Sequence, residues 1–221
     1  LGTITLATLR SDLRARINEI APKKFSDGEL NRWLNVGQLE TAIRIKEFNE
    51  QWYLASKAVT VVAGDNGNDN FDLDHATNYF GSDWAKVLEI HYIIATTWVG
   101  IITANKAIPM IPISSLLEYK NNSAWGSADP TCSQVGSKLY LSENVATSDA
   151  FTIFYYRKPV DMTSSTNLDV PDWSQDIVLM FAYNQCLRKL NMTTKDVDRN
   201  ITDRLNELKR TYMIDKEYDK E

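Results

Sequence analysis

Residues 25–35 read Phe-Ser-Asp-Gly-Glu-Leu-Asn-Arg-Trp-Leu-Asn, and this stretch contains the clearest start of a helix in the chain. Ser26 followed three residues later by Glu29 is the pattern of a capping box, in which each side chain accepts a hydrogen bond from the other residue's backbone N–H. Phe25 before the cap and Leu30 just inside it can form a hydrophobic staple. Apolar residues continue at helical spacing, and we predict a helix that ends near Gln51.

A shorter helix precedes this one, so the chain opens with a helical hairpin. Its apolar positions recur at helical spacing: Leu6, Leu9, Leu13, Ile17 and Ile20. Thr5 or Thr8 can cap it, and we expect it to end near Ile20, because the residue before Pro22 is pushed out of helical geometry. Gly37 inside the second helix costs about 1 kcal/mol relative to alanine. We therefore expect another backbone to approach it closely, from the first helix or from a neighbouring subunit.

The other end of the chain reads as a second helical hairpin. A third helix is predicted from near Asp172, and a fourth from about Lys195 to Asp215, with a break at residues 191–194 between them. The fourth helix places its apolar residues on one stripe: Ile201, Leu205, Leu208 and Tyr212. If the two ends pair, they form a helical base, and the middle of the chain is a domain inserted between the two hairpins.

The middle of the chain has the pattern of short strands and turns. Strands are predicted at residues 58–63, 71–73, 84–94, 97–103, 138–142 and 150–157, the last two as a pair joined by a turn. Residues 114–120 read as a short helix or turn, and residues 121–136 as a polar loop that contains Cys132. The predicted fold class is α+β, with a helical bundle formed by residues 1–52 and 171–221 and an inserted antiparallel β-sandwich or barrel domain at residues 53–170.

Composition narrows the class of protein. The chain has 221 residues and a formal net charge of −5, so no general attraction to nucleic acid is expected. The two cysteines, Cys132 and Cys186, make no disulfide framework, and we expect reduced thiols. No N-terminal signal is apparent. The most apolar stretch, residues 87–104, contains Glu89 and His91, so we expect no membrane span.

No pattern of catalytic or metal-binding residues emerges. His91 lies in an apolar run and reads as a hydrogen-bonded histidine of a sheet, while His75 follows Asp72 and Asp74 in a cluster that could bind a cation weakly. Residues 64–69 are similar to a calcium loop but lack its terminal glutamate, and a turn is the better interpretation. Phosphate-binding and nucleophile motifs are missing. We expect neither an enzyme nor a cofactor.

Residues with a possible role in assembly are easier to find. Trp125 lies in Asn-Asn-Ser-Ala-Trp-Gly-Ser, a setting too polar to bury it within one subunit. Exposed aromatic residues are enriched at interfaces, although Trp125 could also fold back on its own domain or stack on a carbohydrate. The candidate interface residues are Trp125, Gly37, Arg204, Tyr212 and Tyr218.

Three stretches carry a resemblance to a known family. They are residues 5–17 with 25–35, then Tyr155-Tyr156-Arg157-Lys158-Pro159, where a strand leads into a linker, and then Pro171-Asp172-Trp173 before an apolar helix and a charged last helix. In this order the chain resembles the head-to-tail adaptor proteins of short-tailed bacteriophages. It departs from their pattern at Val36, where a polar residue is expected, which bears on which face of the second helix is solvated.

The resemblance implies a structural virion protein without catalytic activity. Such adaptors form a ring, commonly of twelve copies, in the neck between capsid and tail, after assembly in the host cytoplasm. The resemblance also implies docking on the portal through helical C-terminal parts, contact with tail or nozzle proteins, and a DNA channel that binds DNA without specificity. The charged residues after Tyr212 are then a candidate segment that becomes ordered on docking.

Two alternatives remain open at this point. A tail-associated glycan-binding module or hydrolase would need paired carboxylates, such as Asp72, Asp74 or Glu89. A DNA-packaging factor would bind DNA in a salt-sensitive manner.

Overall fold

The computed structural model of the chain describes residues 3–17, 24–49, 53–74, 79–98, 101, 105–121, 130–164 and 166–218, with side chains described as far as Thr211. The chain divides into two compact units. One contains Leu1–Tyr53 and Lys158–Glu221, and the other contains Leu54–Arg157. Helices build the first unit and antiparallel strands dominate the second, so the predicted α+β class is confirmed.

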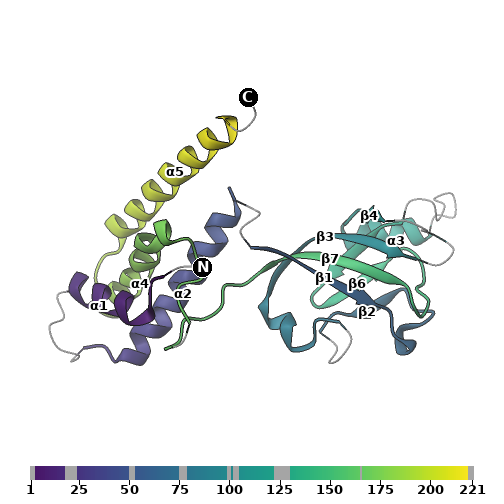
Figure 1. Cartoon of the computed structure of the whole chain (residues 1–221), viewed down its shortest axis with the longest axis horizontal. Helices are drawn as coiled ribbons and strands as arrows, with labels where there is room; N and C mark the ends of the chain where they lie inside the picture. Colours follow the sequence, from purple (N-terminus) through teal and green to yellow (C-terminus); the bar gives the residue numbers. More distant parts are fainter. Residues whose placement is uncertain are drawn as a thin grey trace. The chain divides into compact units, whose positions relative to one another are not determined.

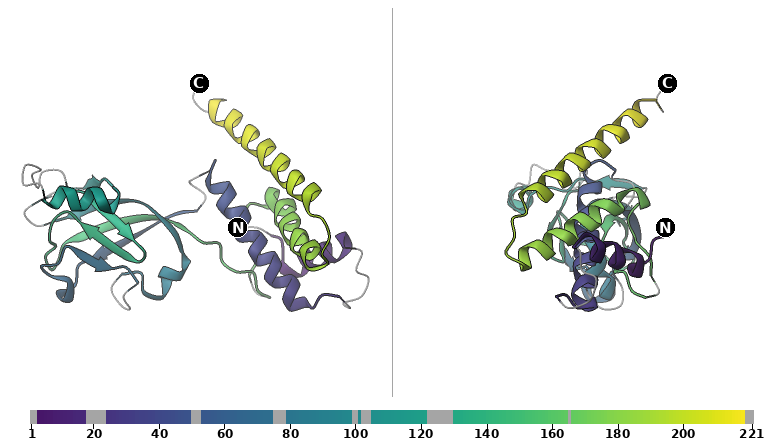
Figure 2. Two further views of the ribbon diagram at one scale, coloured as in Figure 1. Left: turned by 180° about the vertical axis from the view of Figure 1, so that it is seen from behind. Right: turned by 90° about the vertical axis from the view of Figure 1, so that its left-hand side faces the viewer.

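Four helices form the first unit: α1 (Leu6–Arg16), α2 (Asp27–Lys46), α4 (Gln175–Lys189) and α5 (Lys195–Tyr218). A short 3-10 turn, η4 (Asp172–Ser174), leads into α4. Helices α2 and α4 lie side by side, and α1 packs against both (Figure 1). Helix α5 packs on α4 near its start and then continues beyond the other helices (Figures 1 and 2). The helices from the two ends of the chain therefore pack together.

Both helices of the first hairpin begin where the sequence predicts and end earlier. Thr5 caps α1, and its side-chain oxygen accepts the Thr8 N–H at 3.2 Å. The expected end of α1 near Ile20 is wrong, because the chain leaves helical geometry at Ile17, where ψ is 7°. The expected end of α2 near Gln51 is also wrong, because its last turn tightens: the Glu47 N–H donates to Arg44 O at 3.2 Å, an i to i−3 bond.

Gly37 lies where the backbone of α4 approaches α2 closely. A Cβ atom placed on it would lie 2.6 Å from the backbone oxygen of Val178 and 3.3 Å from Cβ of Phe181. Close approach of another backbone is thus found, but the partner is α4 of the same chain. The expectation of the first helix or a neighbouring subunit is corrected, because sequence separation gives no sign that residue 178 returns to residue 37.

Ionic contacts tie α1 to the helices beside it. The Arg14 guanidinium lies 2.7 Å from the Asp27 carboxylate at the start of α2, and this hydrogen bond lowers the pKa of Asp27. Arg16 lies 2.8 Å from Asp176 at the start of α4. Carboxylates are favourable in the first turn of a helix, so both arginines bind groups that the helix dipole already stabilises.

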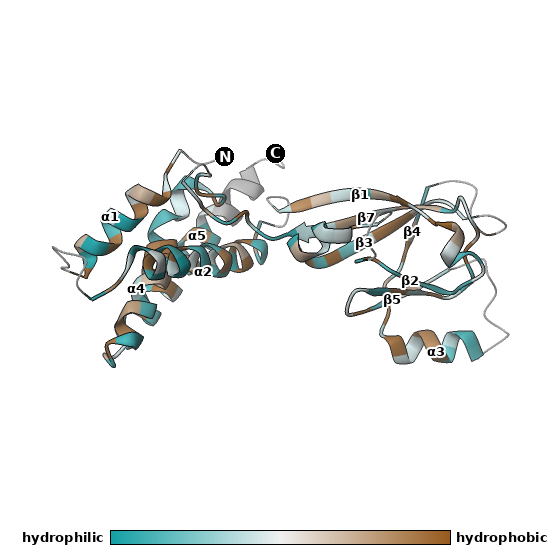
Figure 3. Cartoon of the chain, turned by 90° about the horizontal axis from the view of Figure 1, so that it is seen from below, coloured by the Kyte–Doolittle hydropathy of each residue, from teal (hydrophilic) through white to brown (hydrophobic). Residues whose placement is uncertain are grey.

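The second unit contains two antiparallel sheets, which lie one over the other (Figure 3). The larger has the order β1-β7-β3-β4, formed by β1 (Leu54–Thr60), β7 (Ala150–Arg157), β3 (Val87–Thr97) and β4 (Lys106–Ile108). The smaller has the order β2-β6-β5, formed by β2 (Asn70–Asp72), β6 (Lys138–Leu141) and β5 (Cys132–Val135). Helix α3 (Ile113–Asn121) packs beside β5, and two 3-10 turns, η2 (Ala63–Asp65) and η3 (Gly81–Lys86), complete the unit.

One apolar core joins the two sheets. The ring centroids of Phe71 on β2 and Phe151 on β7 lie 5.9 Å apart, and the ring centroid of the fully buried Trp98 lies 5.5 Å from that of Phe151. Alternating residues of β7 point inward, so Phe151 and Ile153 are completely buried. Aromatic rings that meet across the layers supply much of the buried area of this unit.

Several predicted strands are placed or paired differently. Strands β6 and β7 belong to different sheets, so the predicted hairpin is wrong. The predicted strand at residues 97–103 is wrong where it is described, because β3 runs on to Thr97 and the Ile101 N–H turns back to Trp98 O at 2.9 Å. Trp84 lies in the turn η3 instead of a strand. Cys132, expected in a loop, begins β5 and is completely buried.

Candidate functional site

The middle of α2 lines a hollow on the surface of the helical unit, and hydrogen bonds anchor the start of that helix. At its start the predicted capping box is present: Ser26 Oγ accepts the Glu29 N–H at 3.2 Å, and the Ser26 N–H donates to Glu29 Oε2 at 3.0 Å. Glu29 also accepts a hydrogen bond from Lys189 Nζ at the end of α4, and this bond lowers the pKa of Glu29 to about 2. Lys189 Nζ lies 5.4 Å from the centroid of the Phe25 ring.

Two side-chain amides then fasten the segment 158–170, here called the strap, along α2. The Asn35 amide donates to Met162 O at 3.2 Å and accepts the Met162 N–H at 2.8 Å. The Gln38 amide donates to Val160 O and accepts the Asp169 N–H, both at 2.8 Å. Each side-chain amide therefore uses both its donor and its acceptor to bind backbone groups of the strap. The sequence pattern places the strap in the β domain, whereas in the structure it belongs to the helical unit.

The strap is closed on itself by Asp169. Its carboxylate accepts the Val160 N–H at 2.8 Å, and its backbone oxygen accepts the Tyr53 hydroxyl at 2.9 Å. Gln38 and Tyr53 are almost completely buried, so water cannot replace their bonds at little cost. The strap is thereby a fixed wall beside α2.

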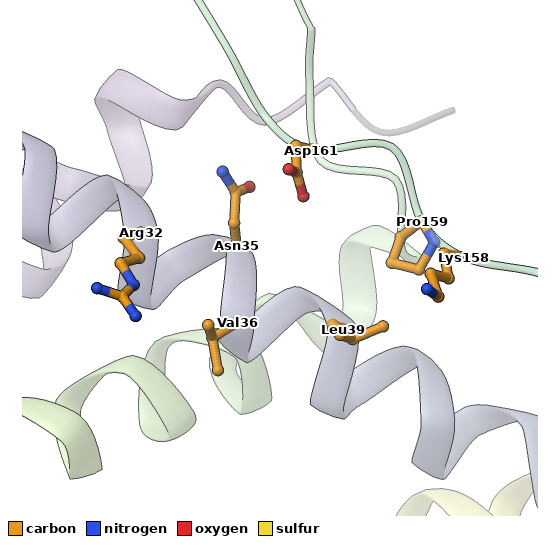
Figure 4. A pocket seen from close by; sticks show the side chains of 7 residues that line it. All are labelled: Arg32, Asn35, Val36, Leu39, Lys158, Pro159 and Asp161. Atoms are coloured by element: carbon orange, nitrogen blue, oxygen red, sulfur yellow. The ribbon is translucent and has the colours of Figure 1, made fainter. Parts of the chain in front are cut away.

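Between α2 and the strap lies a hollow of about 390 Å³, called here the α2 hollow (Figure 4). Its apolar surface comes from Val36, which is 38% exposed, from half-buried Leu39 and from buried Pro159. Exposure of Val36 shows that this face of α2 is solvated despite the valine. The full lining is Arg32, Asn35, Val36, Leu39, Lys158, Pro159 and Asp161.

The charges around the α2 hollow are unbalanced. Arg32 and Lys158 lie at its margins, and in the described part of the chain no carboxylate forms an ion pair with either. Asp161 is the one acidic residue in its lining. Two cations beside exposed aliphatic groups form a site that suits a chain segment with both apolar and acidic residues.

A second hollow of about 370 Å³ lies where α5 meets α2 and α4. Its lining is Arg44, Glu47, Phe181, Asp198, Ile201, Thr202, Leu205 and Asn206. Ile201 is 5% exposed, whereas Leu205 and Leu208 are only half-buried. The apolar stripe predicted for α5 therefore begins inside the bundle and continues along the part of the helix that leaves it.

The predicted interface residues are dispersed. Gly37 is buried against α4, and Arg204 on α5 forms an ion pair with Glu207 at 2.5 Å. Tyr212 and Tyr218 lie within the helical range of α5, and their side chains lie outside the described residues. Trp125 also lies outside them. The structure thus brings none of the described candidates into one site.

Sequence reasoning missed the α2 hollow and the amides beside it. Asn35 and Gln38 are three residues apart and share one face of a helix, which is a weak signal. Their partners lie more than 120 residues further along the chain, and no local pattern indicates such a pairing.

The structure also shows where most of the residues considered for catalysis or metal binding lie. His91 on β3 lies 3.2 Å from the Tyr156 hydroxyl, which agrees with a hydrogen-bonded sheet histidine, and His75 lies outside the described residues. Asp72 is on β2 and Glu89 on β3, in different sheets. Where residues are described, no three His, Cys, Asp or Glu side chains gather to hold a metal ion. None of the described helices is both long and apolar enough to cross a lipid bilayer.

Comparison with known proteins identifies the family. The model of the family described as SU10 adaptor protein matches residues 4–215, which include both units. No curated protein matches the chain. Because the family match covers nearly the whole chain, this protein belongs to the SU10 adaptor protein family and is a structural head-to-tail adaptor of a bacteriophage.

Proposed function

We propose that this adaptor forms a closed ring in the neck of the virion, between the portal and the tail, with twelve copies in the ring. The observation that carries the proposal is the extent of the family match, because residues 4–215 include the helical unit and the β unit together. A contact between two different surfaces of one chain repeats from copy to copy, and it closes into a ring when the rotation allows.

The helical unit is the part that we expect to meet the portal. Its α2 is fixed at the start by the capping box and along its length by Asn35 and Gln38, so it can present a surface without first becoming ordered. Helix α5, with the candidate residue Arg204, continues beyond the other helices and offers further surface. The β unit is then available to tail proteins.

The ring is expected to continue the DNA channel without holding DNA. A net charge of −5 opposes binding to the phosphate backbone, and a channel through which DNA passes must not bind it tightly. A gel-shift measurement at physiological salt should therefore find no stable complex with duplex DNA. A salt-sensitive shift would favour a DNA-packaging factor instead.

Portal binding is tested with the purified chain and the portal of the same phage. We expect the adaptor to bind the assembled portal ring. Failure to bind the portal, together with binding or hydrolysis of a glycan, would replace this proposal with the hydrolase or glycan-binding alternative.

A further inference from the structure

The lining of the α2 hollow carries an excess of positive charge, with two basic side chains and one acidic side chain, Asp161. Arg32 and Lys158 carry two positive charges at the margin of a hollow whose apolar surface includes Val36 and Leu39. Among the described residues neither cation has an ion-pair partner, although the protein as a whole is acidic. Charges across a binding interface are usually complementary, so the two cations favour an acidic occupant.

The wall of this hollow is already formed. Asn35 and Gln38 hold the strap by four hydrogen bonds of 2.8–3.2 Å, and Pro159 is buried within it. The surface that an occupant meets is therefore already fixed by folding. Little further conformational entropy is lost when a short segment binds, which favours binding.

The chain itself contains a segment of matching chemistry. Residues 212–221 read Tyr-Met-Ile-Asp-Lys-Glu-Tyr-Asp-Lys-Glu: three consecutive apolar residues are followed by four acidic residues, two lysines and a second tyrosine. Helix α5 carries the first part of this segment, to Tyr218, beyond the other helices of its own unit (Figures 1 and 2). This end of α5 thus extends away from the helical bundle of its own chain.

We propose that residues 212–221 of one copy occupy the α2 hollow of the next copy. Tyr212, which continues the apolar stripe of α5, binds the aliphatic surface of Val36 and Leu39, and the acidic residues that follow meet Arg32 and Lys158. The hollow and the segment are different surfaces of the same chain, so the contact is heterologous and repeats around a ring. This inference rests on the proposed function and names the contact that builds the ring.

Cross-linking between two variants tests the contact directly. Both natural cysteines, Cys132 and Cys186, are buried, so an engineered exposed cysteine is the reactive one. One full-length variant carries Val36→Cys and the other a cysteine at position 212, 213 or 214 in turn. After mixing and mild oxidation, at least one pair should form a disulfide-linked dimer at about fivefold or higher yield than the control pair. In the control, Val135→Cys replaces Val36→Cys, since Val135 is an exposed valine of the β unit. Equal yields would overturn the proposal.

Charge exchange tests the recognition. Arg32→Glu with Lys158→Glu should lower the cross-link yield about threefold to tenfold, and Asp215→Lys with Glu217→Lys in the other copy should restore it. The matched control Lys138→Glu changes an exposed lysine of the β unit and should leave the yield unchanged. A yield insensitive to charge, or a cysteine at 214 that links only to an added portal, would contradict the proposal.

Native mass analysis of the same samples separates this inference from the proposed function. A ring that forms without a cross-link between positions 36 and 212–214 would refute this contact and leave the ring intact. Absence of both the ring and the cross-link when the assembled portal is also present would refute both.

Discussion

Replacement of Gly37 by alanine should destabilise the helical unit, although alanine is the better helix former. The new Cβ would lie 2.6 Å from the backbone oxygen of Val178, whereas real Cβ contacts are almost never shorter than 3.0 Å. Because the obstacle is backbone, α2 and α4 must move apart along their whole contact. Such overpacking costs up to about 3 kcal/mol, and alanine in a helix returns about 1 kcal/mol. The expected net loss is up to about 2 kcal/mol.

The free energy of unfolding is measured by urea denaturation, followed by the circular dichroism of the helices. Gly28→Ala is the matched control, because Gly28 is in the same helix and no atom lies within 4 Å of its Cβ position. That substitution should be neutral or stabilising by up to about 1 kcal/mol. A Gly37→Ala protein as stable as Gly28→Ala would refute the close packing of α2 on α4.

Three further predictions follow from other contacts. Gln38→Leu leaves Val160 O and the Asp169 N–H unpaired and buried, so it should lower the free energy of unfolding by about 2–4 kcal/mol and speed hydrogen exchange in the strap; unchanged exchange would contradict this. The pKa of Glu29 is lowered to about 2 in the folded protein. The stability that ionised Glu29 gives the folded state is therefore complete above the unfolded pKa near 4.5 and is lost as the pH falls toward 2. The melting temperature of the helical unit should fall over that range, less so in Glu29→Gln; equal slopes would count against the Lys189 contact. Burial raises the pKa of the Cys132 thiol to about 12, so a thiol reagent at pH 8 should modify it only after unfolding, and rapid labelling of the native protein would contradict its position.

Features that depend on neighbouring residues could be predicted from the sequence. The capping box at Ser26 and Glu29 requires only residues three apart, and it is present. The apolar stripes of α1 and α5 follow helical period, and Leu9, Leu13 and Ile201 are buried as expected. Helix ends were less predictable, because the last turn can tighten by an i to i−3 bond without a sequence signal.

Strand pairing depends on distant residues and was predicted less well. The run from Lys138 to Ser142 lies close in sequence to β7, but β1 and β3 already flank β7, so β6 pairs in the other sheet. Cys132 was expected in a loop because polar residues surround it. In a strand alternate residues face opposite sides, so one buried cysteine among polar neighbours is compatible with β5.

The α2 hollow could not be predicted for a related reason. Arg32, Val36 and Leu39 share one face of α2, which the helical period does indicate. The opposite wall consists of Lys158, Pro159 and Asp161, and the amide bonds that place it connect residues more than 120 positions apart. A functional surface made by two distant segments becomes apparent only in the folded chain.

The central claim is that identical copies of this adaptor close into a ring on the portal. Native mass spectrometry of the purified chain, alone and with its assembled portal, tests that claim most directly. We predict one discrete complex that contains twelve adaptor copies per portal ring and no partially filled series at saturation. An adaptor that stays monomeric and unbound at every portal concentration would contradict the account.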